Sequence, residues 1–243
     1  MIRTWRPWMI PVLAIASACA RRPAGPPEPQ PKGFGAAVVL VSGEKQVGGV
    51  GAQLEQPVVV QVNDAKGAAV AAALVRFTGA GSVGFQPDRG LTGSDGQFTT
   101  NVSLGSVAGQ YQIVASTTDS SGKRAEVRIE EIALGYQELL GQQLNQVHCI
   151  RCHDPESTPE RVSNHDNLTA KAHAFTDGAV LNPMSDASLV AMISHGGAAL
   201  NKSAEMPPYG NRLTKVEIDA LTAFIRAVAD PPYRPQGVFD ASN

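Results

Sequence analysis

The sequence predicts two domains, an all-β sandwich followed by an all-α domain. Short runs of alternating apolar and polar residues cross 34–134, with turn residues between them, as in a sheet protein. Beyond Gly135 the apolar residues recur every three to four positions, which is the spacing of helices. The chain has 243 residues, of which 24 are Gly and 17 are Pro, and this composition suits a sandwich with a linker better than one large enzyme core.

Six alternating runs mark the expected strands, and turn residues punctuate them at 63–67, 95–96 and 120–122. Around seven short strands at this spacing favour an Ig-like sandwich. The inward residues of the six runs are Val38 and Leu40; Val58, Val60 and Val62; Val75 and Phe77; Phe98, Val102 and Leu104; Tyr111, Ile113 and Ala115; Val127 and Ile129.

The segments 57–67, 75–78, 92–99 and 108–113 resemble those of the invasin-type bacterial Ig-like domain. The resemblance covers nearly all of 34–134. Because this region has neither Cys nor Trp, an antibody-type core with a disulfide and a buried tryptophan is excluded.

Cys149, Cys152 and His153 form a C-x-x-C-H string at the end of the helix predicted to follow Gly135. This string is the attachment signature of a c-type haem. Two thiols each bond a vinyl group of one porphyrin, and the next histidine presents its imidazole to the iron. Half of a zinc site and a dithiol redox pair are the alternatives, but there is no second cysteine pair and no βαβ pattern. We therefore expect one covalently attached haem c.

Met206 can offer a thioether sulfur as the second axial ligand of the iron, which favours a high reduction potential. Its competitors for this role are Met184, His173 and His195.

Four other side chains are expected to have structural roles. Met192 lies among apolar residues of a predicted helix and is expected to pack in the core. His195 is expected to end that helix just before Gly196, and His148 and His165 are expected to be solvated.

A helix is expected to begin at Thr214, because Thr214 and Glu217 have the spacing of a capping box. Pro231 and Pro232 should end it. One apolar stripe on this helix can bury itself against the first helix and the haem; it consists of Ile218, Leu221, Phe224, Ile225 and Val228.

The order of these elements resembles the class I (mitochondrial-type) cytochrome c domain over about 135–229. By that resemblance, Cys149 and Cys152 hold the haem, and His153 and Met206 ligate its iron. In this family a proline usually supports the proximal histidine, and Pro155 and Pro159 are both candidates for it.

The N-terminus carries Arg3 and Arg6, then an apolar run, and reaches Cys19 through small residues. It resembles a bacterial lipoprotein signal, in which the cysteine becomes the first mature residue and is acylated. Cleavage without lipid attachment stays an alternative, because Ala16 stands where leucine is commonest. The apolar run is about a dozen residues, too short for the ~20 that a spanning helix needs.

The expected organisation is a signal peptide at 1–18, a lipid-anchored proline-rich linker at 19–33, the sandwich at 34–134, the haem domain at 135–232 and a tail at 233–243. The linker should be extended. We expect the protein in the bacterial cell envelope, on the periplasmic or cell-surface side and anchored to the membrane by lipid.

No nucleophile elbow, phosphate loop or dinucleotide fingerprint is present, so we expect an electron-transfer protein and not an enzyme. The net charge of −2 and a mildly acidic haem domain argue against a nucleic-acid partner, and no small-molecule substrate is evident. The expected function is a membrane-tethered monohaem cytochrome that carries single electrons between redox-protein donors and acceptors. One alternative is a haem-bearing subunit of an exported dehydrogenase or reductase complex. Another is an Ig-like binding or adhesion module whose haem domain reports redox state.

Overall fold

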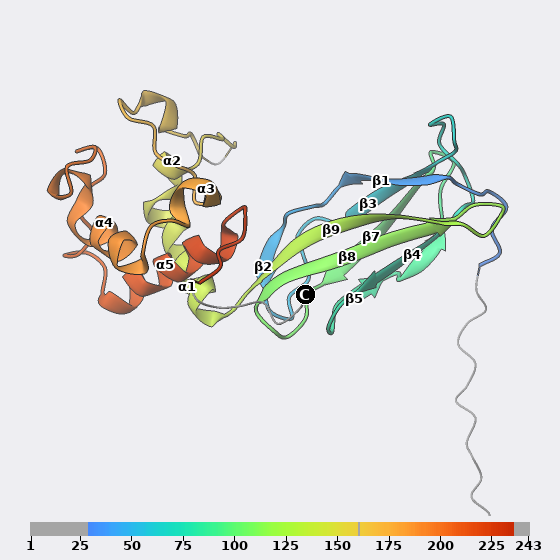
Figure 1. The fold of residues 1–243 in the computed structure, drawn as a ribbon, viewed down its shortest axis with the longest axis horizontal. Helices are drawn as coiled ribbons and strands as arrows, with labels where there is room; N and C mark the ends of the chain where they lie inside the picture. Colours follow the sequence, from blue (N-terminus) through green and yellow to red (C-terminus); the bar gives the residue numbers. More distant parts are fainter. Residues whose placement is uncertain (1–28, 160, 236–243) are drawn as a thin grey trace, which may run out of the picture.

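The computed structural model describes residues 29–159 and 161–235, which form a β sandwich followed by a helical domain (Figure 1). The expected lipidation residue Cys19, the expected signal peptide and most of the expected linker and tail lie outside the described residues. Within the described ranges, no helix is long and apolar enough to cross a membrane.

Two sheets make up the sandwich. One has the order β1-β3-β7-β5, with β1 at Ala37–Ser42, β3 at Val58–Asn63, β7 at Gln97–Ser103 and β5 at Gly84–Gln86. The other has the order β2-β9-β8-β4-β6, with β2 at Val47–Gly49, β9 at Arg124–Leu134, β8 at Gly109–Thr118, β4 at Leu74–Gly79 and β6 at Arg89–Leu91. The paired strands are antiparallel except β2 and β9, which are parallel, so the chain changes sheet between β1 and β2.

The sandwich core is built from the alternating residues of the strands. On β3 the side chains of Val58, Val60 and Val62 are fully buried, whereas those between them are half-buried. Phe77 lies between two further rings, with centroids 5.8 Å from Phe85 and 6.2 Å from Phe98. The predicted β sandwich and its aliphatic core are thus confirmed.

The predicted turns are also present, and aspartate side chains close them. Asp64 Oδ1 accepts the N–H groups of Lys66 and Ala68, and Asp119 Oδ1 accepts those of Ser121 and Lys123. These bonds are the local side-chain-to-backbone bonds that make aspartate a turn former.

Three strands were not predicted, namely β2, β5 and β6. Each has only three residues, and none shows a buried alternation of its own. Pairing with β9, β7 and β4 makes them strands, and this pairing leaves no periodic signal in the sequence.

The helical domain follows the sandwich with only Gly135 between β9 and the first helix. Its elements are α1 at Tyr136–His148, α2 at Ile150–His153, a 3-10 turn at His165–Asn167, α3 at Gly178–Leu181, α4 at Asp186–Ala199 and α5 at Lys215–Val228.

Helix α5 begins and packs as predicted. Thr214 Oγ1 accepts the N–H of Glu217 at 3.3 Å, and the Glu217 carboxylate accepts the N–H of Thr214 at 2.7 Å, so the capping box is complete. All five residues of the predicted apolar stripe are buried.

Helices α1 and α5 pack at Gly141, which is buried. A Cβ on this glycine would lie 2.1 Å from the Ala220 carbonyl oxygen and 2.6 Å from Phe224 Cβ. The two backbones can come this close only because residue 141 has no side chain.

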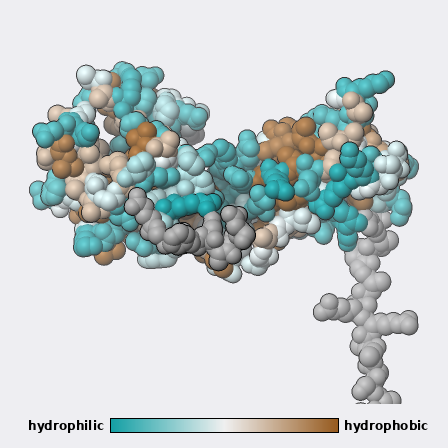
Figure 2. Space-filling view, in the orientation of Figure 1, coloured by the Kyte–Doolittle hydropathy of each residue, from teal (hydrophilic) through white to brown (hydrophobic). Residues whose placement is uncertain are grey.

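A third apolar cluster lies where the sandwich meets the helices. Its buried members are Leu134 at the end of β9 and Phe224 and Val228 of α5. On the outer surface, hydrophobic residues gather over β1 (Figure 2), where Val39 and Val41 are exposed.

Candidate haem-binding site

The C-x-x-C-H string forms a single helical turn directly after α1. The N–H of Cys149 bonds to the Asn145 carbonyl at 2.9 Å, and the N–H groups of Cys152 and His153 both bond to the Cys149 carbonyl at 3.0 Å. Residues three and four positions apart lie on one face of a helix. The turn therefore presents the two thiols and the imidazole in the same direction.

Both cysteines are half-buried free thiols. Burial, with a smaller contribution from Cys152, raises the pKa of the Cys149 thiol to about 12. A thiol in this state carries its proton, unlike the reactive thiolate of a dithiol redox pair. Within the described ranges, no cluster of three or more His, Cys, Asp or Glu side chains is arranged to hold a metal ion.

His153 is oriented by a backbone carbonyl. Its Nδ1 lies 2.8 Å from the carbonyl oxygen of His173, and since a carbonyl only accepts, Nδ1 carries the proton and Nε2 keeps its lone pair. Burial lowers the pKa of His153, which favours the neutral imidazole. The ring of Phe175 packs 4.6 Å away, centroid to centroid. Pro155 and Pro159 were the candidates for the proline that supports this histidine, and the group that bonds its Nδ1 is the His173 carbonyl.

A cavity of about 490 Å³ opens beside the string. Cys149, Cys152, His153 and Met206 all line it. Its volume is within the range of small-molecule and cofactor sites. Most of its wall is apolar, formed by Leu168, Phe175, Leu181, Leu189, Ile193, Leu221 and Ile225.

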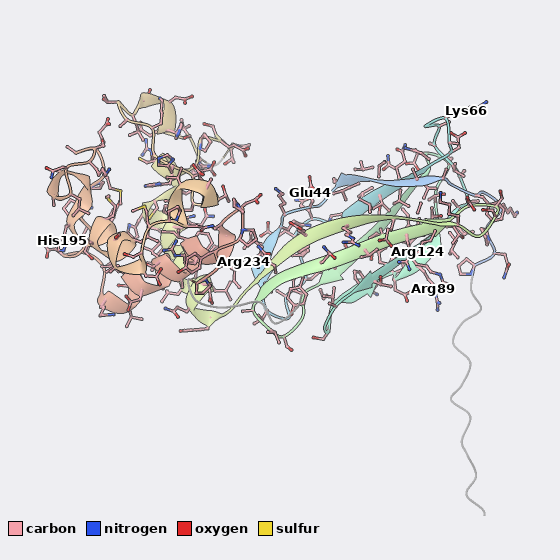
Figure 3. The ribbon with its side chains drawn as sticks, viewed as in Figure 1. Glu44, Lys66, Arg89, Arg124, His195 and Arg234 are labelled. Atoms are coloured by element: carbon pink, nitrogen blue, oxygen red, sulfur yellow. The ribbon has the colours of Figure 1, made fainter. Side chains whose placement is uncertain are left out.

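The competitors of Met206 separate by position. His195 is exposed and does not line this cavity, and Figure 3 places it at the outer end of the helical domain. His173 lines the cavity, but its carbonyl accepts the His153 proton and its own Nδ1 lies 3.1 Å from Asp177 Oδ2. Met184 lines the cavity, as Met206 does.

Three of the expected structural roles differ in the structure. Met192 lines the cavity, because α4 turns this face towards it. His148 is half-buried and packs edge-on against Tyr209 with centroids 5.7 Å apart, and the His165 side chain is only 18% exposed. The prediction that both histidines are solvated was wrong: Tyr209, far along the chain, packs on His148, and His165 bonds to neighbouring residues of its own loop.

Two residues of the Met206 segment were missed as site residues. The Tyr209 hydroxyl donates to the His148 carbonyl at 2.9 Å and ties this segment to the end of α1. The Glu205 carboxylate accepts the backbone N–H groups of Thr169, at 3.0 and 3.2 Å, and of Ala170, at 3.4 Å. The only signal for either residue was its position next to Met206.

The residues present fit a covalently attached haem. Two free thiols and an imidazole nitrogen with a free lone pair lie on one face of a helical turn, a thioether lies elsewhere in the cavity wall, and most of the remaining wall is apolar. This donor set, histidine nitrogen with methionine sulfur, is that of cytochromes c.

The helical part of the chain is a c-type cytochrome domain. Residues 137–225, which are less than half of the chain, match the family model described as cytochrome c oxidase, cbb3-type, subunit III. A domain of this family implies a haem c cofactor, haem-based electron transfer and redox partners. No curated protein sequence matches the chain.

Solved structures similar to the chain include domains of intimin and one adhesin. The D00–D0 domain of intimin is 18% identical, with 44% of this chain and 50% of that chain covered and a TM-score of 0.31. The D0–D1 domain of intimin is 17% identical, with coverages of 42% and 49% and a TM-score of 0.30. The adhesin InvE of Yersinia pseudotuberculosis is 14% identical, with coverages of 40% and 32% and a TM-score of 0.31. The chain spans half or less of the length of these structures.

Proposed function

We propose that this chain is an exported, membrane-tethered monohaem cytochrome that carries single electrons between redox proteins. One observation carries the proposal: a single, mostly apolar cavity brings Cys149, Cys152 and His153 of one helical turn together with Met206 of a separate segment. Haem c, when bound there, supplies a one-electron change between ferrous and ferric iron.

Each of the four side chains has a separate part in holding the cofactor. Cys149 and Cys152 form the two thioether bonds. His153 provides Nε2 as an axial ligand, in an orientation set by its Nδ1 bond to the His173 carbonyl. Met206 provides its sulfur as the other axial ligand, and thioether ligation favours a high reduction potential.

The remainder of the chain controls the surroundings. The apolar wall excludes water from the cavity, which disfavours the more highly charged oxidised state. Tyr209 is buried and bonds to the His148 carbonyl, so the Met206 segment and the attachment turn are held together across the cavity.

A second candidate is a haem-bearing subunit of an oxidase or reductase complex. The family description favours it, since that family is a subunit of a cytochrome c oxidase. Purification from native membranes separates the two candidates. A catalytic partner that co-purifies in stoichiometric amount supports the subunit, whereas a chain that is recovered alone and exchanges electrons with soluble acceptors supports the free carrier.

Membrane tethering is part of the proposal and rests on the sequence around Cys19. Metabolic labelling with palmitate tests it. We expect the wild-type chain to be labelled and to fractionate with membranes, and Cys19→Ser to be unlabelled and released. Equal fractionation of both chains would contradict the tether but not the haem site.

The haem itself is tested in a host that attaches c-type haem. The wild-type chain should show c-type bands in a reduced-minus-oxidised spectrum, and haem should stay with the polypeptide after denaturation. Cys149→Ala together with Cys152→Ala should abolish this retention. Cys19→Ser is the matched control, because it removes the third cysteine and should leave the spectrum unchanged. Colourless wild-type protein would refute the proposed function.

A further inference from the structure

Helix α4 contains a backbone break close to Met206. Its range is Asp186–Ala199, but Gly196 has φ 74° and ψ 172°, which is not helical. This region of backbone space is populated essentially by glycine alone. Regular helix therefore stops at His195 and resumes after the break.

The segment that carries Met206 bonds to this break, backbone to backbone. The N–H of Gly197 donates to the Met206 carbonyl at 3.0 Å. The N–H groups of Tyr209 and Gly210 donate at 2.9 Å to the carbonyls of Ile193 and Ser194. A continuous helix would bond those two carbonyls to residues 197 and 198. The break thus lets α4 accept hydrogen bonds from the Met206 segment.

The contact leaves no room for side chains at three positions. A Cβ on Gly196 would lie 2.7 Å from the Met206 carbonyl oxygen and 2.8 Å from Pro208 N. A Cβ on Gly197 would lie 2.0 Å from the Ser203 carbonyl oxygen, and one on Gly210 would lie 2.9 Å from the Ser194 carbonyl oxygen. We name Gly196, Gly197 and Gly210 the glycine seat.

The segment that carries Met206 is also bonded on its other side, through Glu205. The Glu205 carboxylate bonds to the N–H groups of Thr169 and Ala170, in the stretch that follows the 3-10 turn. The residue next to Met206 is thus bonded to one segment while the Met206 carbonyl is bonded to another. Together these bonds fix the backbone of Met206 beside the cavity that its side chain lines.

We propose that the glycine seat is a positioning element that sets where the Met206 sulfur lies, and so whether methionine or another ligand occupies that side of the iron. This inference rests on the proposed function. Gly197 lines the cavity, whereas Gly196 and Gly210 do not, and all three act through the backbone of residues 203–210. Their removal should release Met206 while the thioether bonds and His153 keep the haem on the chain.

Gly196→Ala tests the inference in the full-length holoprotein. We expect covalent haem content and c-type bands to be retained, the sulfur-to-iron charge-transfer band of the oxidised protein to be lost, and the midpoint potential to fall. Added imidazole should bind the oxidised iron about tenfold more tightly or better, because methionine no longer competes for the site. If Gly196→Ala yields no holoprotein, Gly210→Ala decides the question by the same three measurements.

Gly51→Ala is the matched control. Gly51 has a similar φ of +71°, but a Cβ there would meet no atom within 4 Å, so this variant carries the backbone strain without the contact. It should keep the band, the potential and the imidazole affinity of the wild type. Wild-type behaviour of both seat variants would overturn the inference. A wild type without haem would overturn the proposed function instead, and a charge-transfer band that survives Met206→Ala would overturn the ligand assignment.

Discussion

Lys45 Nζ lies 2.7 Å from Asp230 Oδ2, and this ion pair joins the segment between β1 and β2 to the residues that follow α5. The two side chains are 64% and 62% exposed, so water screens their attraction. The two domains also meet at an apolar cluster of Leu134, Phe224 and Val228, all buried. The apolar cluster, and not the ion pair, therefore stabilises the contact between the two domains.

Leu134→Ala should lower the free energy of unfolding by about 2–5 kcal/mol, because it empties a fully buried site. Urea denaturation of the full-length holoprotein measures this. Lys45→Met keeps most of the side chain's length and removes its charge, and we expect its transition to coincide with that of the wild type. If Lys45→Met lowered the free energy of unfolding more than Leu134→Ala did, this account of the interface would be contradicted.

Glu131 gives the sandwich a pH dependence. Its side chain is fully buried on β9, Oε2 accepts the N–H of Gln46 at 2.7 Å, and Oε1 has no hydrogen-bond partner among the residues that the structure describes. Burial, opposed by the Gln46 bond and aided by the charge of Glu44, raises the pKa of Glu131 from 4.5 to about 7. Glu44 lies on the segment between β1 and β2, at the end of the sandwich near the helices (Figure 3).

Because the pKa of Glu131 is higher in the folded state, that state binds more protons than the unfolded chain between pH 4.5 and about 7. As pH rises through this window, the contribution of Glu131 to the free energy of unfolding should fall by up to about 3 kcal/mol, and it should stay low at higher pH. Glu131→Gln should flatten this slope and stabilise the protein above pH 7, as urea titrations at several pH values would show. Glu130→Gln, at an exposed position of the same strand, should keep the wild-type slope. If the free energy of unfolding had the same slope against pH in the wild type and in Glu131→Gln, Glu131 would not be the origin of the pH dependence.

Much of the fold was predictable because it depends on short-range patterns. The alternation of Val58, Val60 and Val62 and the helical spacing of Ile218 and Leu221 each follow from one element burying one face. The capping box of α5 is equally local. These features need only a few neighbouring residues, so the sequence displays them directly.

The haem-site details were less predictable because they depend on contacts between distant segments. The support of His153 is a carbonyl 20 positions away, and every residue has a carbonyl, so no residue type marks it. The burial of His148 depends on Tyr209, 61 positions further on. Gly196 and Gly197 did leave a signal, since two adjacent glycines in a helical pattern indicate a break or a close approach.

Gly141→Ala tests the packing of α1 against α5. Alanine favours a helix by about 1 kcal/mol over glycine. The added methyl group would nevertheless lie 2.1 Å from the Ala220 carbonyl oxygen, and overpacking of this kind costs about 1–3 kcal/mol or more. We expect a net loss of stability and a lower melting temperature in calorimetry of the holoprotein. Gln146→Ala, at an exposed position of α1, is the control and should change little. A melting temperature at or above that of the wild type in Gly141→Ala would show that the helices can separate at no cost.

Met206→Ala tests the axial ligand against the other methionines of the cavity. Met184, Met192 and Met206 all line the cavity, so lining alone does not select the ligand. Met206 differs because its backbone is fixed on both sides, by the Gly197 N–H and by the Glu205 carboxylate of the preceding residue. A ligand whose backbone is already fixed loses no further backbone entropy when it binds iron. We therefore expect Met206→Ala to lose the sulfur-to-iron charge-transfer band, lower the midpoint potential and bind imidazole about tenfold more tightly or better. Met184→Ala and Met192→Ala each remove a thioether sulfur from the same cavity wall and should keep the band. Loss of the band in Met184→Ala alone would show that Met184, and not Met206, is the ligand.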